Sequence, residues 1–180
     1  MKIAIHQPNF MPWNPFFEKI RSADVFVILT HCQFEKNNFQ NRFNMLDRWN
    51  TMSVNKGLEP IQNKKYLEPQ RDWNKIKENL KEFRQTLDQF DCLIQENLVQ
   101  TNVAIIKKIC RMLDIETEIV LDYPTNLKGT DRLVDICKTM KSTEYISGPS
   151  GKNYLELRKF GDIKVTYHTN VLKRPILEIL

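Results

Sequence analysis

The sequence predicts an α/β protein with a mostly parallel, Rossmann-like sheet flanked by helices and a helical insertion in the middle of the chain. One observation is a strand-helix-strand pattern near the N-terminus, where two apolar runs enclose a segment with helical apolar spacing. Another is that later apolar runs alternate with helical patterns, which is typical of a parallel sheet. Finally, no linker, repeat or low-complexity tract interrupts residues 1–180, so we expect a single α/β domain.

The N-terminal segment supplies the first strand-helix-strand unit. Residues 2–5 form a short apolar run, and residues 23–29 (ADVFVIL) form a β-branched run of the kind that is buried on both faces of a sheet. Between them, residues 12–21 carry apolar side chains at helical spacing, and Pro15 fits only the first turn of such a helix. Strands joined by a helical crossover are expected to be parallel.

The middle of the chain predicts the helical insertion, over about residues 72–113. Residues 32–49 are polar and aromatic, and residues 50–54 (NTMSV) form a weak strand. Asp72 can cap a first helix that runs to about Leu87. Apolar spacing predicts a second helix near residues 101–113.

The last third returns to alternating strands and helices. Residues 117–122 (TEIVLD) form a third strand, and a helix is expected over residues 131–140 with Thr130 as its N-cap. Residues 144–148 (EYISG) and 163–168 (IKVTYH) then supply the last two strands.

Composition indicates a cytoplasmic globular protein. Apolar residues make up 41% and charged residues 27% of the chain, which is ordinary for this class. No apolar run approaches the roughly 20 residues of a membrane-spanning helix, so no membrane insertion is expected, and the N-terminal run is too short for a signal peptide. The cysteines form no C-x-x-C pair and lie mostly in apolar patterns, so we expect buried free thiols. They are Cys32, Cys92, Cys110 and Cys137.

The chain is basic, with a net charge of +5 and a pI near 9.0. This balance permits a nucleic acid, an anionic membrane surface or a phosphorylated substrate as partner. The positive charge is dispersed along the chain, so a generally basic surface accounts for it equally well.

Polar segments follow four of the predicted strands. They span residues 6–9 (HQPN), 31–42, 123–132 (YPTNLKGTDR) and 147–153 (SGPSGKN). Because ligands of open α/β sheets bind beyond the carboxyl ends of the strands, this clustering is the strongest physical sign of a ligand site.

The segment after the first strand carries the main catalytic candidate, His6. A histidine at a strand end can be a general base, a ligand or a phosphate contact, or else a hydrogen-bonded structural residue. Gln7 and Asn9 add amide groups, which Pro8 and Pro12 hold in place. We therefore expect His6 to act in the site.

The later polar segments add candidate ligand contacts. Residues 37–42 (NNFQNR) hold amides that can cap local backbone or bind a ligand, and the guanidinium fork of Arg42 suits phosphate or carboxylate, although a surface ion pair is the alternative. The composition of residues 147–153 suits backbone N–H groups around an anion, but an ordinary strand-to-helix turn explains it as well. We expect His6 and Arg42 to line one cavity.

Several chemistries lack their sequence signatures. The chain contains neither an H-E-x-x-H motif nor paired cysteines, so no metal is expected. The G-x-S-x-G motif and the dinucleotide-binding glycine motif are also absent. A Cys32 nucleophile paired with His31 is not expected, because neighbours along a strand point to opposite faces.

The run HQPNFMPWNPFFEKIRSADVFVIL followed by CQFEKNNFQNR resembles the WbqC-like protein family. Its members open with H-Q-P-N-[YF]-x-P, continue through a helix into ADVFV, and then carry VQ[YF]-x-K-x-x-[FW]-x-N-R. The later segments LDIETEIV, EYISGPSGKNYLE and IKVTYH also resemble the family's second half, so the similarity covers most of the chain. The chain departs from the family at Thr30 and His31, where members usually have two acidic residues.

The resemblance implies a role in bacterial O-antigen and related surface-polysaccharide biosynthesis, as a glycine-type or other acyl or aminoacyl transferase acting on a sugar. The ligand expected from it is a nucleotide- or lipid-linked sugar with a phosphate handle. The cofactor and the oligomeric state stay open; the strand-loop-helix layout at the N-terminus leaves a nucleotide or nucleotide-sugar as a candidate ligand. By position, the family's characteristic residues are His6, Gln7, Asn9, Gln33, Lys36, Asn41, Arg42, Ser147, Gly148 and Tyr154.

The alternative is a non-catalytic protein that binds nucleic acid or a nucleotide through its basic surface. Aromatic and basic residues alternate between residues 34 and 49, although we expect the aromatic side chains there to form core. The aromatic residues of this segment are Phe34, Phe39, Phe43 and Trp49, and the basic residues are Lys36, Arg42 and Arg48.

Overall fold

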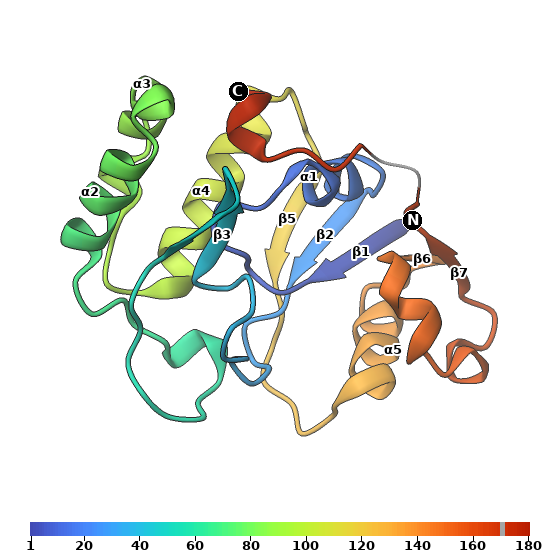
Figure 1. Cartoon of the computed structure of the whole chain (residues 1–180). Coiled ribbons are helices and arrows are strands. Elements are labelled where there is room, and N and C mark those ends of the chain that lie inside the picture. Colours follow the sequence, from blue (N-terminus) through green and yellow to red (C-terminus); the bar gives the residue numbers. More distant parts are fainter. Residues whose placement is uncertain (170–171) are drawn as a thin grey trace.

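The computed structural model describes residues 1–169 and 172–180 and confirms the α/β prediction (Figure 1). Five parallel strands form one sheet in the order β5-β2-β1-β6-β7. The strands are β1 (Lys2–His6), β2 (Val25–Ile28), β5 (Glu118–Leu121), β6 (Glu144–Ser147) and β7 (Lys164–Tyr167).

The strand order reverses between β1 and β6. From β1 the chain moves outward to β2 and then to β5, and it returns to pair β6 with the other edge of β1 before β7 extends the sheet. A reversal of this kind leaves a crevice beyond the carboxyl ends of the two central strands, which is where open α/β sheets bind ligands.

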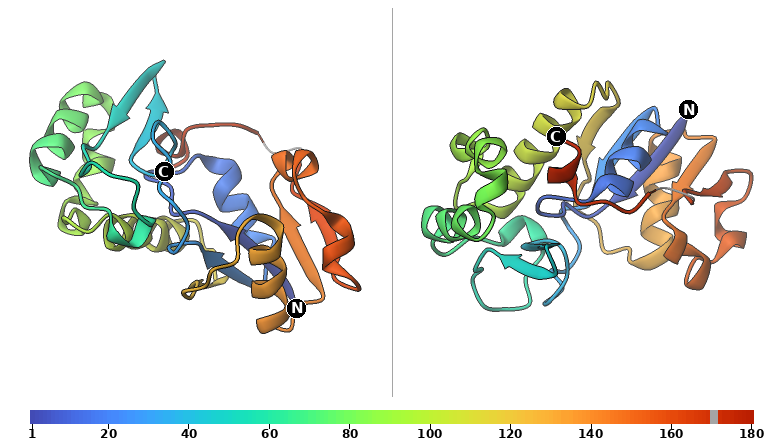
Figure 2. Two further views of the ribbon diagram at one scale, coloured as in Figure 1. Left: turned by 90° about the horizontal axis from the view of Figure 1, so that it is seen from below. Right: turned by 45° about the horizontal axis from the view of Figure 1, so that its top comes forward.

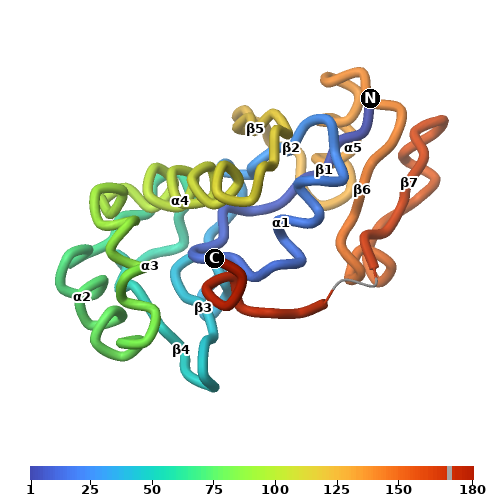
Figure 3. Tube along the Cα trace, turned by 90° about the horizontal axis from the view of Figure 1, so that it is seen from above, coloured from blue at the N-terminus to red at the C-terminus, as the bar shows by residue number. Residues whose placement is uncertain are grey.

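Helices cover both faces of the sheet (Figure 3). Alternate side chains of β2 point to opposite faces, so Phe26 packs in one cluster with α1 (Asn14–Arg21) and α4 (Leu98–Met112). Val27 packs in a second cluster with α5 (Gly129–Thr139). This two-sided burial is what the continuous apolar run over residues 23–29 predicts.

The helical insertion lies at one end of the sheet, beside β5 and β2 (Figure 1). It consists of α2 (Pro69–Asn79), α3 (Arg84–Asp88) and α4. The prediction of one continuous helix from Asp72 to Leu87 is wrong, because the backbone at Leu80 leaves the helical region (φ −117°, ψ 50°). Asp72 does not cap α2 either, since its carboxylate accepts the backbone N–H of Ser53 at 2.7 Å.

An antiparallel hairpin, β3 (Arg42–Met45) and β4 (Arg48–Thr51), replaces the weak strand predicted at residues 50–54 and projects from the molecule (Figure 2). Its two turn residues, Leu46 and Asp47, have φ of 52° and 55°. Positive φ at both positions defines the turn that suits a two-residue hairpin, but it normally calls for Asn-Gly. Leu-Asp carries no such signal, so the hairpin was not predictable from its turn.

Short 3₁₀ turns complete the chain: Ile61–Asn63, Lys81–Phe83, Asp91–Leu93, Pro149–Asn153, Leu157–Phe160 and Ile176–Glu178. The helix α5 begins one residue before the predicted N-cap Thr130, whose hydroxyl instead accepts the backbone N–H of Glu156. Within residues 1–169 and 172–180, no helix combines the length and the apolar character needed to cross a bilayer.

The cysteine prediction holds only in part. All four cysteines are free, and Cys110 and Cys137 are buried as expected. Cys32 is half-buried and Cys92 is exposed, because Cys92 falls in a 3₁₀ turn rather than on a buried helix face.

Candidate functional site

A cavity of about 630 Å³ opens at the carboxyl ends of β1 and β6, where the strand order reverses. We call it the switch-point cavity. Its lining combines apolar side chains with polar groups from the end of β1, from α1, and from the segments that follow β2, β6 and β7. The polar lining includes His6, Gln7, Asn9, Lys19, Glu35 and His168.

Lys19 is a buried cation of this cavity, with only 5% of its surface exposed. Its Nζ donates a hydrogen bond to the carbonyl of Ile5 at 2.8 Å. Among the residues that the structure describes, no carboxylate lies within ion-pairing distance of this nitrogen. Burial therefore lowers the pKa of Lys19 from 10.5 to about 7, so the ammonium and the free amine coexist near neutral pH.

His6 lies beside Lys19 at the end of β1. Its ring contacts Phe16 edge-on, with ring centroids 5.1 Å apart, and Nδ1 lies 3.0 Å from the carbonyl oxygen of Gln7. Because a carbonyl only accepts, Nδ1 carries the hydrogen and Nε2 keeps its lone pair. Burial, followed by the charge of Lys19, lowers the pKa of His6 to about 3, so the ring is neutral at pH 7.

His168 brings a second imidazole to the cavity from the segment after β7. Its backbone N–H donates to the carbonyl of Ser147 at 2.8 Å, which attaches this segment to β6. Its Nε2 is buried without a hydrogen-bond partner in the described part of the chain. Burial and the charge of Lys19 lower the pKa of His168, although Glu18 acts in the opposite direction.

A buried amide network holds the loop after β1. Gln40 donates to the side-chain oxygen of Gln7 at 2.6 Å, and Gln7 in turn donates to the thiol of Cys32 at 3.4 Å. Asn102 of α4 donates to the carbonyls of both Pro8 and Gln40, at 2.8 and 2.7 Å. Both ends of the Gln7 amide are thus engaged within the protein, so Gln7 positions the loop.

Asn9 differs from Gln7 although both line the cavity. It is only 7% exposed, and its side-chain amide makes no hydrogen bond to any residue that the structure describes. An amide placed in this way can still donate to and accept from a bound ligand.

The structure brings together five of the residues that the sequence singles out. They are His6, Gln7, Asn9, Gly148 and Tyr154, all in the lining of the switch-point cavity. The other five do not line it. They are Gln33, Lys36, Asn41, Arg42 and Ser147.

The residues outside the lining have other surroundings. Gln33 and Lys36 are exposed, and the Asn41 amide donates to the carbonyl of Met52 at 2.7 Å. Ser147 is buried at the end of β6, where its hydroxyl donates to the carbonyl of Gly148 at 3.1 Å. Asn41 and Ser147 therefore contribute through packing and backbone contacts.

Arg42 belongs to the β3–β4 hairpin, contrary to the expectation that it shares a cavity with His6. Its guanidinium lies over the Trp49 ring, 4.0 Å from the centroid, and donates to the carbonyl of Asn37. The cation beside His6 is Lys19 instead. Helix α1 supplies it from only 13 positions further along the chain.

Two of these cavity residues were not predicted, Lys19 and His168. Lys19 gives only a weak local signal, because at 100° per residue it lies at the edge of the apolar stripe of α1, beside Phe16 and on the opposite side of it from Ile20, where lysines are common. No comparable signal marks His168, which reaches the cavity only because β7 pairs beside β6.

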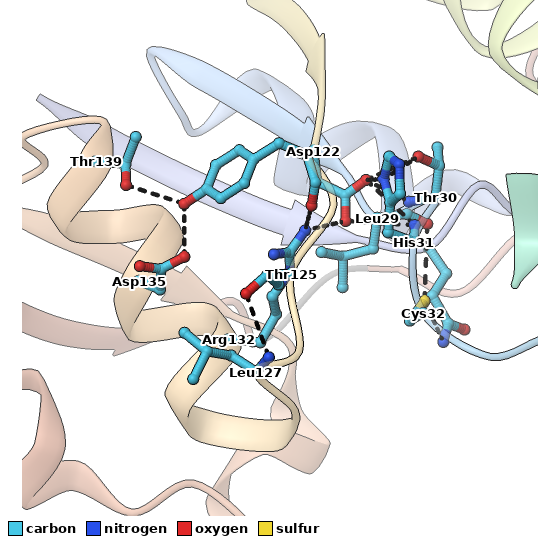
Figure 4. A network of polar contacts seen from close by, with 12 residues as sticks. Leu29, Thr30, His31, Cys32, Asp122, Thr125, Leu127, Arg132, Asp135 and Thr139 are labelled. Atoms are coloured by element: carbon cyan, nitrogen blue, oxygen red, sulfur yellow. Dashed lines mark hydrogen bonds and ion pairs between the residues drawn. The ribbon is translucent and has the colours of Figure 1, made fainter.

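A second polar cluster lies at the carboxyl ends of β2 and β5 (Figure 4). Asp122 is buried there, with His31 Nδ1 at 2.9 Å and Arg132 Nη2 at 2.7 Å from its carboxylate oxygens. Thr30 donates to the same carboxylate through its backbone N–H and its hydroxyl. Burial alone would raise the pKa of Asp122, but hydrogen bonds from His31, Thr30 and Arg132 lower it.

Thr30 and His31, where the chain departs from the family pattern, both contact Asp122 through their side chains. In the described residues, no group of three or more His, Cys, Asp or Glu side chains is placed to hold a metal ion. The expectation that the protein uses no metal stays a prediction.

Comparisons with known proteins agree with the sequence resemblance. The model of the WbqC-like protein family matches residues 7–174, nearly the whole chain. The uncharacterized protein Rv1507c of Mycobacterium tuberculosis is 28% identical over 183 residues, which cover 91% of this chain and 79% of that protein. The search of solved structures found no match.

Proposed function

Because the chain belongs to the WbqC-like protein family, we propose that it transfers an acyl or aminoacyl group, of the glycine type, to a nucleotide- or lipid-linked sugar for bacterial surface polysaccharide such as O-antigen. The observation that carries the proposal is the buried Lys19 in the switch-point cavity, which has no carboxylate partner among the described residues. A buried, unpaired cation is costly, and a phosphate handle on the substrate would supply the missing negative charge.

The remaining polar groups suit the sugar. The free amide of Asn9 can accept from and donate to a hydroxyl or to the acyl oxygen. Glu35 lines the same cavity, and its carboxylate, which accepts from the Asn38 amide, keeps lone pairs that can accept from sugar hydroxyls. A volume of about 630 Å³ accommodates a phosphorylated monosaccharide, since ligand pockets typically measure about 300–1,000 Å³.

His6 is the proposed general base. Its Nε2 would take the proton of the acceptor amine or hydroxyl on the sugar. At the same time the nitrogen or oxygen of that group would attack the carbonyl carbon of an activated acyl donor, a thioester or an acyl phosphate. The bond between this carbon and the leaving group then breaks, and the leaving group takes the electron pair.

Substrate binding would also activate this base. Burial and the charge of Lys19 together hold the pKa of His6 near 3, which makes a weak base. A bound phosphate places negative charge beside both groups and raises both pKa values. Base strength and substrate binding are thus coupled.

The first test is calorimetric titration with an amino sugar 1-phosphate and with the same sugar lacking phosphate. Charge-assisted hydrogen bonds contribute about 1.5–3 kcal/mol, so Lys19→Met should weaken binding of the phosphate form about 10- to 150-fold. Lys36→Met is the matched control, because Lys36 is exposed and does not line the cavity. Equal affinity of wild type and Lys19→Met would contradict the proposal.

Transfer itself is tested by incubating the protein with amino-sugar nucleotides and activated acyl donors and analysing the products by mass spectrometry. His6→Ala should abolish product formation while His31→Ala keeps it, since His31 does not line the cavity. Product at the wild-type rate from His6→Ala would remove His6 from the mechanism.

A second candidate function is non-catalytic nucleic-acid binding, which the β3–β4 hairpin favours. The expectation that the aromatics of residues 34–49 are core holds for Phe34 and Phe43, whereas Phe39 and Trp49 are nearly half exposed, at 46% and 47%. Exposed rings next to an arginine can stack on bases. Binding to single-stranded DNA or RNA that weakens steeply with salt would favour this candidate, and no binding at low salt would eliminate it.

A further inference from the structure

A second, apolar pocket of about 340 Å³ adjoins the switch-point cavity. It lies between the loop after β1, the β3–β4 hairpin and the C-terminal segment over residues 173–177. Four residues line both hollows and form the boundary between them. They are Asn9, Trp13, Phe39 and Lys173. We call this second hollow the aromatic pocket.

Three aromatic side chains of the aromatic pocket are partly exposed and are not part of the hydrophobic core. Trp13, Phe39 and Trp49 are 45%, 46% and 47% exposed, and Phe39 and Trp49 lie 5.6 Å apart between ring centroids. The floor is apolar, since Phe10 and Met11 are almost fully buried beneath. Large aromatic side chains left open beside an apolar floor offer flat surfaces to a planar ring.

Cations surround this aromatic surface. Lys173 Nζ lies 5.7 Å from the centre of the Trp13 ring at the boundary between the two hollows. Arg174 also lines the aromatic pocket, and Arg42 covers the Trp49 ring at 4.0 Å. A purely hydrocarbon ligand would gain nothing from this charge, whereas a phosphorylated aromatic ligand would use both the rings and the cations.

We propose that the aromatic pocket binds the base of a nucleoside diphosphate, whose phosphates pass Lys173 toward Lys19 and whose attached sugar enters the switch-point cavity. This inference rests on the proposed function and narrows its substrate to a nucleotide-linked sugar. A long polyprenyl chain does not fit, because the pocket holds only about 340 Å³ and its lining includes the cations Lys173 and Arg174.

The test uses nucleoside diphosphates without sugar (ADP, GDP, CDP and UDP) and, as the lipid arm, farnesyl phosphate. Each is titrated by calorimetry and by tryptophan fluorescence, in which Trp13 and Trp49 report on the pocket and the buried Trp73 does not. Base stacking on an aromatic side chain is worth about 1–3 kcal/mol, so Trp49→Ala should weaken the best nucleoside diphosphate about 5- to 150-fold. Phe39→Ala should do the same.

Leu58→Ala is the control, since Leu58 is 83% exposed and lines neither hollow. Unchanged nucleoside diphosphate affinity in both Trp49→Ala and Phe39→Ala overturns the inference, as does absence of nucleoside diphosphate binding. Farnesyl phosphate binding that Trp49→Ala weakens, without nucleotide binding, overturns it in favour of a lipid. The sugar 1-phosphate titration reports separately on the proposed function, because it depends on Lys19 and not on Trp49.

Discussion

Replacing Lys19 by methionine should stabilise the protein while removing its anion binding. Methionine keeps the length of the lysine side chain but carries no charge. Lowering the pKa of Lys19 from 10.5 to about 7 corresponds to about 5 kcal/mol against the charged form in the folded state. At pH 7 the cost is about 4 kcal/mol, somewhat less than the full value, because in about half of the native molecules Lys19 is the uncharged amine.

The sign of the pH dependence follows from the same shift. Between pH 7 and 10.5 the unfolded chain holds a proton on Lys19 that the native protein has largely lost, so the free energy of unfolding rises with pH across this window. By pH 10 the cost has fallen to about 1 kcal/mol. Loss of the hydrogen bond to the carbonyl of Ile5 costs Lys19→Met about 1 kcal/mol at every pH.

The net expectation is that Lys19→Met is about 3 kcal/mol more stable than wild type at pH 7 and about equal to it at pH 10. Urea unfolding of both proteins at the two pH values measures this difference, and the titrating groups whose pKa does not depend on Lys19 cancel in the comparison. A destabilised variant at pH 7, or a difference that does not change with pH, refutes the reasoning.

Lys77→Met is the matched control, for which we expect a change in the free energy of unfolding of the opposite sign. Lys77 is 4% exposed, like Lys19, but its Nζ pairs with Asp88 at 2.9 Å and with Asp91 at 2.8 Å. Burial alone would lower the pKa of Lys77, yet these two carboxylates raise it. Lys77→Met should therefore lose about 1–3 kcal/mol of stability, in contrast to Lys19→Met.

Two further stability predictions come from the carboxyl edge of the sheet. Asp122→Asn should lose about 3 kcal/mol in urea unfolding at pH 7, because it leaves the buried Arg132 without its carboxylate. Since folding lowers the pKa of Asp122, this loss of stability should shrink as pH falls below 3.8. A loss that is constant with pH would argue against a role of the Asp122 charge in stability. Gly151→Ala should lower the melting temperature, because its Cβ would overlap the buried side chain of Ser147, whereas Gly148→Ala has open space and should be neutral. Equal effects of the two glycine variants would contradict the contact.

Local patterns in the sequence were sufficient for most of the sheet. The apolar runs near residues 2–5, 23–29 and 117–122 became β1, β2 and β5, because burial on both faces demands continuous apolar side chains whatever lies around them. Pro15 correctly marked the first turn of α1. The polar loop after β1 correctly placed His6 and Asn9 in the cavity, because its position at a strand end fixes the edge of the sheet that it reaches. That residues 1–180 form a single domain stays a prediction.

Tertiary structure decided the character of the site. The separation of Arg42 from His6 follows from the β3–β4 hairpin, whose positive-φ turn has no glycine or asparagine to reveal it. His168 lines the same cavity as His6 only because of the order of β1, β6 and β7 in the sheet. The pKa of Lys19 is lowered because segments distant in the sequence bury its amino group away from water, and a local sequence pattern does not show this burial.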